Sequence, residues 1–266
     1  MDLKTAVCVI VKNEADHILE WIFHHINIGF DTILLYDDHS TDSTREKAAQ
    51  AGTIADVRVM PWPETERERQ AASYEAVCRS FEAEFDWIAF FDADEFIVPS
   101  AGERLSDLLA RHGDSSAIAI PWLMFGSSGH EKATDNLIIA DYTQRADYDF
   151  PPNRHVKSIV RPSQVTRCIN AHIFNVEGDY AMPDGSPVEW KSAGLLVNTP
   201  DYTNWRLHHY FTRSKEHWEK RLMRGQLGKT VRTDKEFSTY DRNEIRDESA
   251  LVFIKEINIM YKELDD

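Results

Sequence analysis

The segment at 86–96 carries the side chains that are best suited to chemistry. An apolar run at 87–91, rich in aromatic and branched residues, predicts a buried strand, and Asp-Ala-Asp-Glu at 92–95 follows it directly. Carboxylates just past the carboxyl end of such a strand lie where α/β sheets bind ligands, and the hard oxygens of Asp92 and Asp94 suit Mg²⁺ or Mn²⁺. Because acids attract a phosphate only through a bridging cation, the spacing predicts a metal–nucleotide site. The alternative is that these acids only start a turn or cap a helix.

The preceding residues predict the sheet that would position these acids. Four apolar runs, separated by helical patterns, indicate alternating strands and helices and therefore a mostly parallel sheet with helices on both faces. Polar clusters follow three of the runs, and the carboxyl ends of parallel strands share one edge, so we expect the acids to converge there. The predicted strands are 6–11, 32–36, 57–60 and 87–91, and the predicted helices are 18–29, 43–52 (opened by a capping box of Ser43 and Glu46) and 64–84.

Beyond Pro99 the pattern changes from alternation to a group of strands. A region at 176–204, rich in Pro, Gly and Asn, predicts a long loop. We expect strands at 117–125, 137–143, 155–160, 165–174 and 205–211, and helices at 104–111, 214–224 and 248–264.

Composition excludes several classes of function. With 266 residues, 42% of them hydrophobic, the chain is long enough for a substantial core, and its net charge of −15 disfavours nucleic acid and anionic lipid as partners. The three cysteines, Cys8, Cys78 and Cys168, are too widely spaced to suggest a zinc site or a disulfide framework. Because no apolar run approaches the roughly 20 residues of a membrane helix, we expect a soluble, cytoplasmic protein, with peripheral membrane contact left open.

Several short motifs follow one another along the chain. They are Val-Lys-Asn-Glu at 11–14, Tyr-Asp-Asp-His-Ser-Thr-Asp-Ser-Thr at 36–44, Phe-Asp-Ala-Asp-Glu-Phe at 91–96, Trp-Leu-Met-Phe-Gly-Ser-Ser-Gly-His at 122–130, Lys-Ser-Ile-Val-Arg-Pro at 157–162 with His172, and His-His-Tyr at 208–210 with Ser214, Lys220 and Gly225. In this order the chain resembles a nucleotide-sugar glycosyltransferase of the GT-A fold, of family 2 type and close to the family 92-like branch. The resemblance implies one domain over 1–266, with a nucleotide-binding half at 1–100, an acceptor-side half at 101–226 and a C-terminal helical tail at 227–266.

The resemblance also implies roles for residues around the donor. Asp94 would bind Mn²⁺ or Mg²⁺ directly, while Asp92 would bind the metal or the ribose. His209 would be a third metal ligand or, alternatively, a buried histidine of the core. The residues that would contact the donor nucleotide are Val11, Glu14, Asp38 (or Asp37) and Asp92, with Lys157 and Arg161 at the diphosphate unless these two cations only occupy a solvated strand face.

On the acceptor side the resemblance implies a glycan or glycolipid hydroxyl and inversion at the anomeric carbon. Trp122, Phe125 and His130 would flank the acceptor, although the apolar run around Trp122 and Phe125 also favours core packing. A carboxylate must take the proton of the acceptor hydroxyl. The candidates are Asp141, Asp149 and Glu131, because the family's glutamate near position 140 is replaced here by Ala140.

Other classes of protein share parts of this pattern. A nucleotidyltransferase or a metal-dependent phosphohydrolase would use the same metal site without an acceptor groove. A receiver-type signalling module also places acids after two strands of a doubly wound sheet, but it is far shorter than this chain. A non-catalytic sugar-binding relative is a further alternative. The predicted function is nucleotide-sugar glycosyl transfer, in surface polysaccharide synthesis if the resemblance extends that far.

Overall fold

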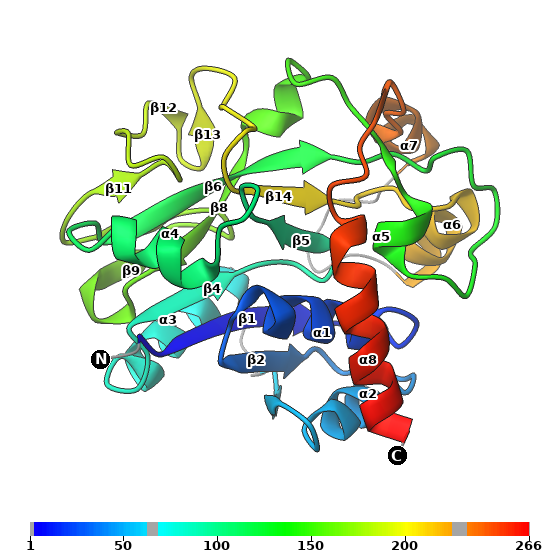
Figure 1. Cartoon of the computed structure of the whole chain (residues 1–266), viewed down its shortest axis with the longest axis horizontal. Helices are drawn as coiled ribbons and strands as arrows, with labels where there is room; N and C mark the ends of the chain where they lie inside the picture. The colour runs from blue at the N-terminus through cyan, green and yellow to red at the C-terminus, as the bar shows by residue number, and fades with distance from the viewer. Residues whose placement is uncertain (1–2, 63–68, 225–232, 266) are drawn as a thin grey trace.

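A computed structural model describes residues 3–62, 69–224 and 233–265 of the chain. Its largest element is a nine-stranded sheet in the order β3-β2-β1-β4-β8-β6-β14-β5, with β11 paired to β6 (Figure 1). The strands of this sheet are β1 (Thr5–Val11), β2 (Thr32–Asp37), β3 (Asp56–Pro61), β4 (Trp87–Phe90), β5 (Glu95–Val98), β6 (Ala117–Met124), β8 (Val156–Val160), β11 (Tyr180–Ala181) and β14 (Arg206–His209).

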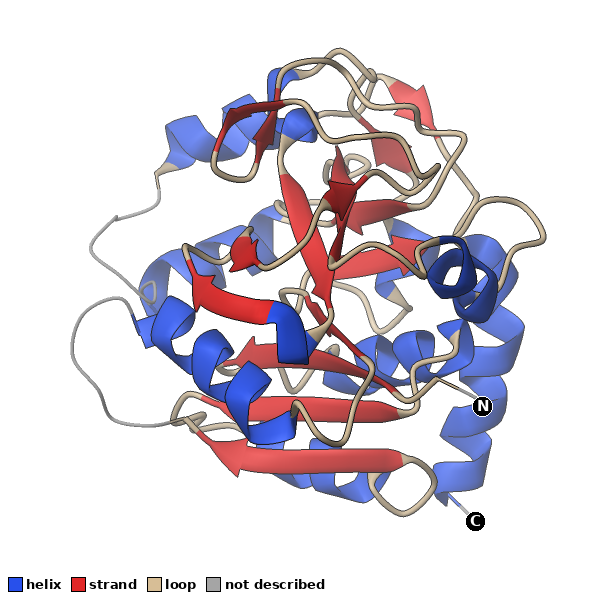
Figure 2. Ribbon diagram, turned by 90° about the vertical axis from the view of Figure 1, so that its left-hand side faces the viewer, coloured by secondary structure: helices blue, strands red, loops and turns tan. Residues whose placement is uncertain are grey.

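The first four strands are parallel, and their central members are buried on both faces. Val7 and Val9 of β1 pack with the helix α1 (Ile18–Ile28), whereas the intervening Cys8 packs on the opposite face with Tyr74 of α3 (Arg69–Phe81). Figure 2 shows helices on either side of the red strands. This alternation is what a continuous apolar strand between two helical layers requires, and the predicted α/β class with a mostly parallel sheet is confirmed.

The remaining helices and short strands cover the sheet and its far end. The helices are α2 (Thr44–Ala51), α4 (Leu105–Arg111), α5 (Ile138–Asp141), α6 (Lys215–Arg224), α7 (Asp234–Tyr240) and α8 (Ile254–Asp265). The short strands outside the sheet are β7 (Gln144–Arg145), β9 (Val165–Cys168), β10 (Phe174–Val176), β12 (Trp190–Ser192), β13 (Leu195–Leu196) and β15 (Ile245–Arg246). None of the helices in the described part of the chain is long and apolar enough to cross a membrane.

The strand predicted at 137–143 is wrong, because the structure has the short helix α5 there. The carboxylate of Glu20, buried on α1, accepts the backbone N–H groups of Ile138 and Ile139 at 2.7 and 3.0 Å. These are donors of the first helical turn, which a strand would have directed to a neighbouring strand. The helix is therefore specified by a residue more than 100 positions away in the sequence.

Two other local predictions also differ from the structure. The region 165–174 is not one strand but the antiparallel pair of β9 and β10, turned at Asn170, whose side chain accepts the N–H groups of His172 and Ile173. The predicted capping box of α2 does not form: Ser43 makes no capping hydrogen bond, and Asp42 accepts the Thr44 N–H instead.

Several elements were not predicted or were only partly predicted. They are β5, β7, β15, α7, and the short strands β11, β12 and β13 inside the region that we expected to be loop. The predicted helix at 248–264 is confirmed from Ile254 onwards. The start of the predicted helix at 64–84, Gly225 and the first residues of the predicted tail lie outside the described residues.

Because the structure buries a histidine, we expect the protein to lose stability in acid. His24 of α1 is fully buried and donates a ring N–H to the carbonyl of Ile97, 2.8 Å away, and burial lowers its pKa to about 4. The unfolded chain takes up this proton near pH 6.5, so the contribution of His24 is constant above pH 6.5 and is lost between pH 6.5 and 4. We expect at most about 3 kcal/mol of unfolding free energy to disappear over this interval.

The variant His24→Gln tests this expectation, because a glutamine amide can donate the same hydrogen bond without titrating. In urea unfolding measured from pH 7.5 to 4, the unfolding free energy of His24→Gln should fall less steeply with decreasing pH than that of the wild type. An equally steep fall in both proteins would show that His24 is not the group responsible.

Candidate functional site

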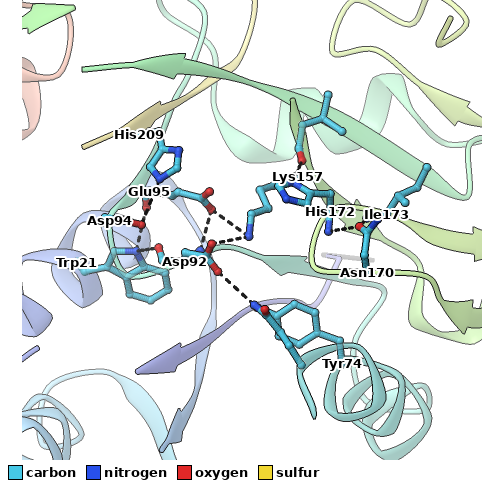
Figure 3. A network of polar contacts seen from close by, with 12 residues as sticks. Trp21, Tyr74, Asp92, Asp94, Glu95, Lys157, Asn170, His172, Ile173 and His209 are labelled. Atoms are coloured by element: carbon cyan, nitrogen blue, oxygen red, sulfur yellow. Dashed lines mark hydrogen bonds and ion pairs between the residues drawn. The ribbon is translucent and has the colours of Figure 1, made fainter. Parts of the chain in front are cut away.

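The turn between β4 and β5 presents the acidic motif at the carboxyl edge of the parallel strands. The side chain of Glu95 accepts the N–H of Asp92 at 2.7 Å, and the indole N–H of Trp21 donates to the carbonyls of Asp92 and Glu95 at 3.1 and 2.9 Å (Figure 3). Because these bonds tie both ends of the turn to buried side chains, the positions of the two aspartates are set by the core rather than by solvent.

Lys157 compensates the charge of Asp92. It lies near the amino end of β8, which runs antiparallel to β4, so its side chain reaches the carboxyl end of β4. Its Nζ is 2.8 Å from Asp92 Oδ2 and 3.6 Å from Glu95 Oε2, and both Lys157 and Glu95 are fully buried. Burial raises the pKa of Glu95 well above its ordinary range. Against the effect of burial, the charges of Asp92 and Glu95 raise the pKa of Lys157, so the lysine stays charged.

Asp94 faces two side chains from the carboxyl-terminal half of the chain. Its Oδ1 is 3.5 Å from Nε2 of His209 on β14, and its Oδ2 is 3.0 Å from Nη1 of Arg221 on α6. Burial opposes ionisation of Asp94, but its contact with His209 and the charge of Arg221 hold the pKa of its carboxyl well below the ordinary value. Asp94 is therefore an ionised carboxylate in a buried setting.

The pair of Asp94 and His209 fits a divalent cation. Burial lowers the pKa of His209, which favours the neutral imidazole that binds metals. The 3.5 Å between Nε2 and Oδ1 is close to the spacing of about 3 Å between neighbouring ligand atoms around an octahedral ion. Within the described residues no three His, Cys, Asp or Glu side chains form a ready metal cage. The protein thus offers part of a ligand set, which suits Mn²⁺ or Mg²⁺ arriving with a diphosphate.

The donor-side candidates lie along the same sheet edge. Val11 ends β1 beside Asp37 at the end of β2, and the N–H of Asp38 donates to the Val11 carbonyl at 2.8 Å. The carboxylate of Asp38 is 3.4 Å from Nζ of Lys12, and Asp37 accepts the N–H of Ser40. The polar residues that follow separate strands therefore lie together at one edge of the sheet, as the sequence predicted. Their contacts with a donor stay predictions.

A buried arginine connects these two parts of the site. Arg213 is 1% exposed and has a positive φ of 52°. Its Nη1 is 3.3 Å from Oε2 of Glu14, and its Nη2 donates to the carbonyl of Ala93 at 3.2 Å. It therefore joins the loop after β1 to the acidic turn after β4. Sequence reasoning missed Arg213, because neither a periodic pattern nor a motif marks it.

Arg161 is not brought to the site. It follows β8, whose antiparallel direction places Arg161 at the opposite edge of the sheet from Lys157. There its guanidinium donates to the carbonyls of Ser115 and Gly113 and lies 4.2 Å from the ring of Trp87. The structure therefore does not bring Arg161 together with Asp92 and Asp94, and its predicted contact with the diphosphate stays a prediction.

The acceptor candidates separate into different environments. Trp122, half-buried, lies with its ring 4.3 Å from that of His209 and 5.2 Å from that of His155, so it adjoins the Asp94 site. Phe125 is 1% exposed and packs on His208, so its predicted contact with an acceptor is replaced by a place in the core. His130, half-buried, packs edge-on against Tyr142 in a separate loop.

The three candidates for the catalytic base remain predictions. Asp141, the last residue of α5, accepts hydrogen bonds from the loop that precedes this helix: from the hydroxyl of Thr134 and, at 3.0 Å, from the amide of Asn136. Asp149 and Glu131 are exposed.

The comparisons of the amino-acid sequence with known proteins point to one family. The sequence model of glycosyltransferase family 92 matches residues 4–248. A family 92 protein of Oryza sativa subsp. japonica is 28% identical over 206 residues, which are 76% of this chain and 34% of that protein. A family 92 protein of Ricinus communis is 26% identical over 209 residues, 76% of this chain and 36% of its own length. The chain thus spans about a third of the length of the curated relatives that it matches.

Similar solved structures include S. aureus TarS 1-349 in complex with UDP-GlcNAc, which is 19% identical with a TM-score of 0.40 and covers 61% of this chain and 46% of that one. Another is glucosyl-3-phosphoglycerate synthase from Mycobacterium tuberculosis, crystallised with Mn²⁺, UDP and glucosyl-3-phosphoglycerate, at 17% identity and a TM-score of 0.28 over 45% of this chain and 44% of that one. Since the family model covers residues 4–248 of 266, the chain belongs to glycosyltransferase family 92.

Proposed function

We propose that the protein transfers a sugar from a nucleotide sugar, most simply a UDP-sugar, to a hydroxyl group of a glycan or glycolipid, with inversion at the anomeric carbon. The observation that carries this proposal is the meeting of an ionised Asp94, a neutral His209 and the acid-lined edge of β1 and β2 at one place in a family 92 chain. By the resemblance, the product enters surface polysaccharide synthesis.

The chemistry required is stabilisation of a departing diphosphate. Asp94 and His209, with Asp92 from the same turn, would hold Mn²⁺ or Mg²⁺, which supplies positive charge to the leaving group when it is bound. Glu14 and Asp38 stand where they would accept hydrogen bonds from a base or ribose. Lys157 keeps Asp92 in a fixed orientation, and Trp122 offers an apolar face to a sugar ring beside the metal ligands. These groups would orient the donor, and a carboxylate from the acceptor side would take the hydroxyl proton.

A thermal-shift screen of UDP-, GDP- and dTDP-sugars tests the proposal. Each sugar nucleotide is added with Mn²⁺ and, in parallel, with EDTA, and hydrolysis of any binder is followed by release of the free nucleotide. A ligand at 100 times its Kd stabilises the folded state by about 2.7 kcal/mol, which moves the Tm by several degrees. We expect a metal-dependent shift with a UDP-sugar.

Two other results would point elsewhere. Binding and hydrolysis of nucleoside triphosphates without binding of any sugar nucleotide would favour a nucleotidyltransferase or phosphohydrolase. If no sugar nucleotide changes the Tm, with or without Mn²⁺, the glycosyltransferase proposal fails for this chain.

A further inference from the structure

An arginine from a distant helix occupies an oxygen that the metal would need. Arg221 lies on α6, and its Nη1 is 3.0 Å from Oδ2 of Asp94, while His209 faces the other oxygen, Oδ1. Both side chains of this ion pair are nearly buried, with 13% of Arg221 and 10% of Asp94 exposed. A guanidinium and a divalent cation cannot share one carboxylate oxygen without strong repulsion, because both are positively charged and little water screens them.

Arg221 is held in a defined position rather than reaching into the site by chance. Its Nη1 also donates to the backbone carbonyl of Phe211 at 2.6 Å, and its guanidinium lies 5.4 Å from the centre of the Phe211 ring. Phe211 follows β14, the strand that carries His209. The arginine is therefore fixed against the same segment that supplies the second metal ligand.

The site already contains other positive charges. Lys157 compensates Asp92, and Arg213 contributes a further positive charge near Asp94. Replacing Arg221 on Asp94 by a divalent cation alone would therefore leave the arginine without its carboxylate, beside acids that already have cationic partners. A diphosphate that arrives with the cation removes this imbalance, because it carries at least two negative charges, and a planar guanidinium matches phosphate oxygens well.

We propose that Arg221 is a place-holder for the divalent cation. It pairs with Asp94 while no donor is bound, moves away from Oδ2 when the cation binds there, and then pairs through its guanidinium with the diphosphate of the donor. The inference rests on the proposed function, because it requires a metal and a nucleotide diphosphate at this site. It makes Arg221 a residue that couples the two ligands. The cation alone binds weakly since it must displace Arg221, and the diphosphate relieves that cost by giving Arg221 a new partner.

The experiment measures Mn²⁺ binding by electron paramagnetic resonance, without and with saturating UDP, and UDP binding by calorimetry at saturating Mn²⁺. The proteins are wild type, Arg221→Gln, Arg221→Lys and, as a control, Arg79→Gln. Arg79 is a matched control because it is also a helical arginine paired with a carboxylate, Glu75, but its side chain is 70% exposed. Circular dichroism establishes that each variant is folded.

The place-holder role predicts opposite changes in the two affinities. Arg221→Gln should bind Mn²⁺ alone about tenfold more tightly than wild type, and should bind UDP at saturating Mn²⁺ about tenfold more weakly. Arg221→Lys should fall between the two, because a lysine keeps the charge but not the planar geometry. Arg79→Gln should match the wild type in both measurements.

The outcomes separate the inference from the function on which it rests. If Arg221→Gln leaves Mn²⁺ affinity unchanged or weakens it, Arg221 does not compete with the metal and the inference is overturned, whereas UDP binding by the wild type keeps the proposed function intact. If the wild type binds no UDP in the presence of Mn²⁺, both are overturned.

Discussion

The variant Asp94→Asn is expected to lose metal-dependent donor binding while keeping its fold. The amide has the size of the carboxylate but no charge, so the hard anionic ligand facing His209 disappears. Because the protein would supply only a few ligands to the metal, the loss of one charged ligand should weaken binding of a UDP-sugar in the presence of Mn²⁺. The expected change in affinity is on the order of 100-fold, equal to about 2.8 kcal/mol. Calorimetric titration of the UDP-sugar at fixed Mn²⁺ measures the change.

Two comparisons make this result specific. Asp184→Asn removes an exposed carboxylate from a distant loop and should bind the donor as the wild type does. In EDTA, the wild type and Asp94→Asn should bind the donor equally weakly, because the metal no longer contributes. Wild-type donor affinity of Asp94→Asn in the presence of Mn²⁺ would show that Asp94 does not hold the metal.

The second large effect is expected from Lys157→Met, which removes a buried charge but keeps most of the apolar side chain. Lys157 and Glu95 are fully buried, and Lys157 also pairs with Asp92, so the variant leaves two neighbouring acids without their cation. Removing one partner of a buried ion pair costs about 3 kcal/mol or more. We expect a loss of unfolding free energy of this size at pH 8, measured by urea denaturation.

The pH dependence of this loss follows from the acids. The pKa of Glu95 is already raised in the folded protein, and without Lys157 it rises further. A raised folded pKa contributes stability below the unfolded value, near 4.3, and that contribution is lost as the pH increases. Because the folded pKa of Glu95 lies higher in the variant than in the wild type, the variant goes on losing stability at pH values where the wild type no longer does. The variant should therefore be less destabilised at pH 5 than at pH 8, and adding Glu95→Gln should restore part of the loss at pH 8.

A surface lysine gives the matched control. Lys191 is exposed, so Lys191→Met should change the unfolding free energy by less than about 0.5 kcal/mol at either pH. An equal effect of Lys157→Met at pH 5 and pH 8 would contradict the view that unpaired acids cause its instability.

The parallel half of the fold could be predicted because its pattern is local. Continuous apolar runs such as 6–11 and 87–91 are compatible with only a few buried structures, and the helices between them leave a doubly wound sheet as the simplest arrangement. The acids at the ends of these strands then share one edge by the direction of the chain alone. Asp38 and Asp94 could therefore be assigned to one neighbourhood from the amino-acid sequence.

The second half was harder to predict because its elements depend on distant partners. The helix α5 forms where the residue pattern suggested a strand, since Glu20 supplies the acceptors for its first turn. Phe125 is apolar in either role, and only its packing on His208 places it in the core. Arg161 and Lys157 have similar sequence surroundings, and only the antiparallel pairing of β8 with β4 sends them to opposite edges of the sheet.

By itself, the sequence determined the succession of strands and helices in the first half, the acidic motif at 92–95 and a family resemblance that the comparison over residues 4–248 confirmed. The tertiary structure decided which cations meet those acids: Lys157 on Asp92, Arg221 on Asp94, and Arg213 between Glu14 and Ala93. The physical reason is that hydrophobic periodicity is a property of neighbouring residues, whereas a buried ion pair forms only between segments that the finished fold brings within a few ångströms.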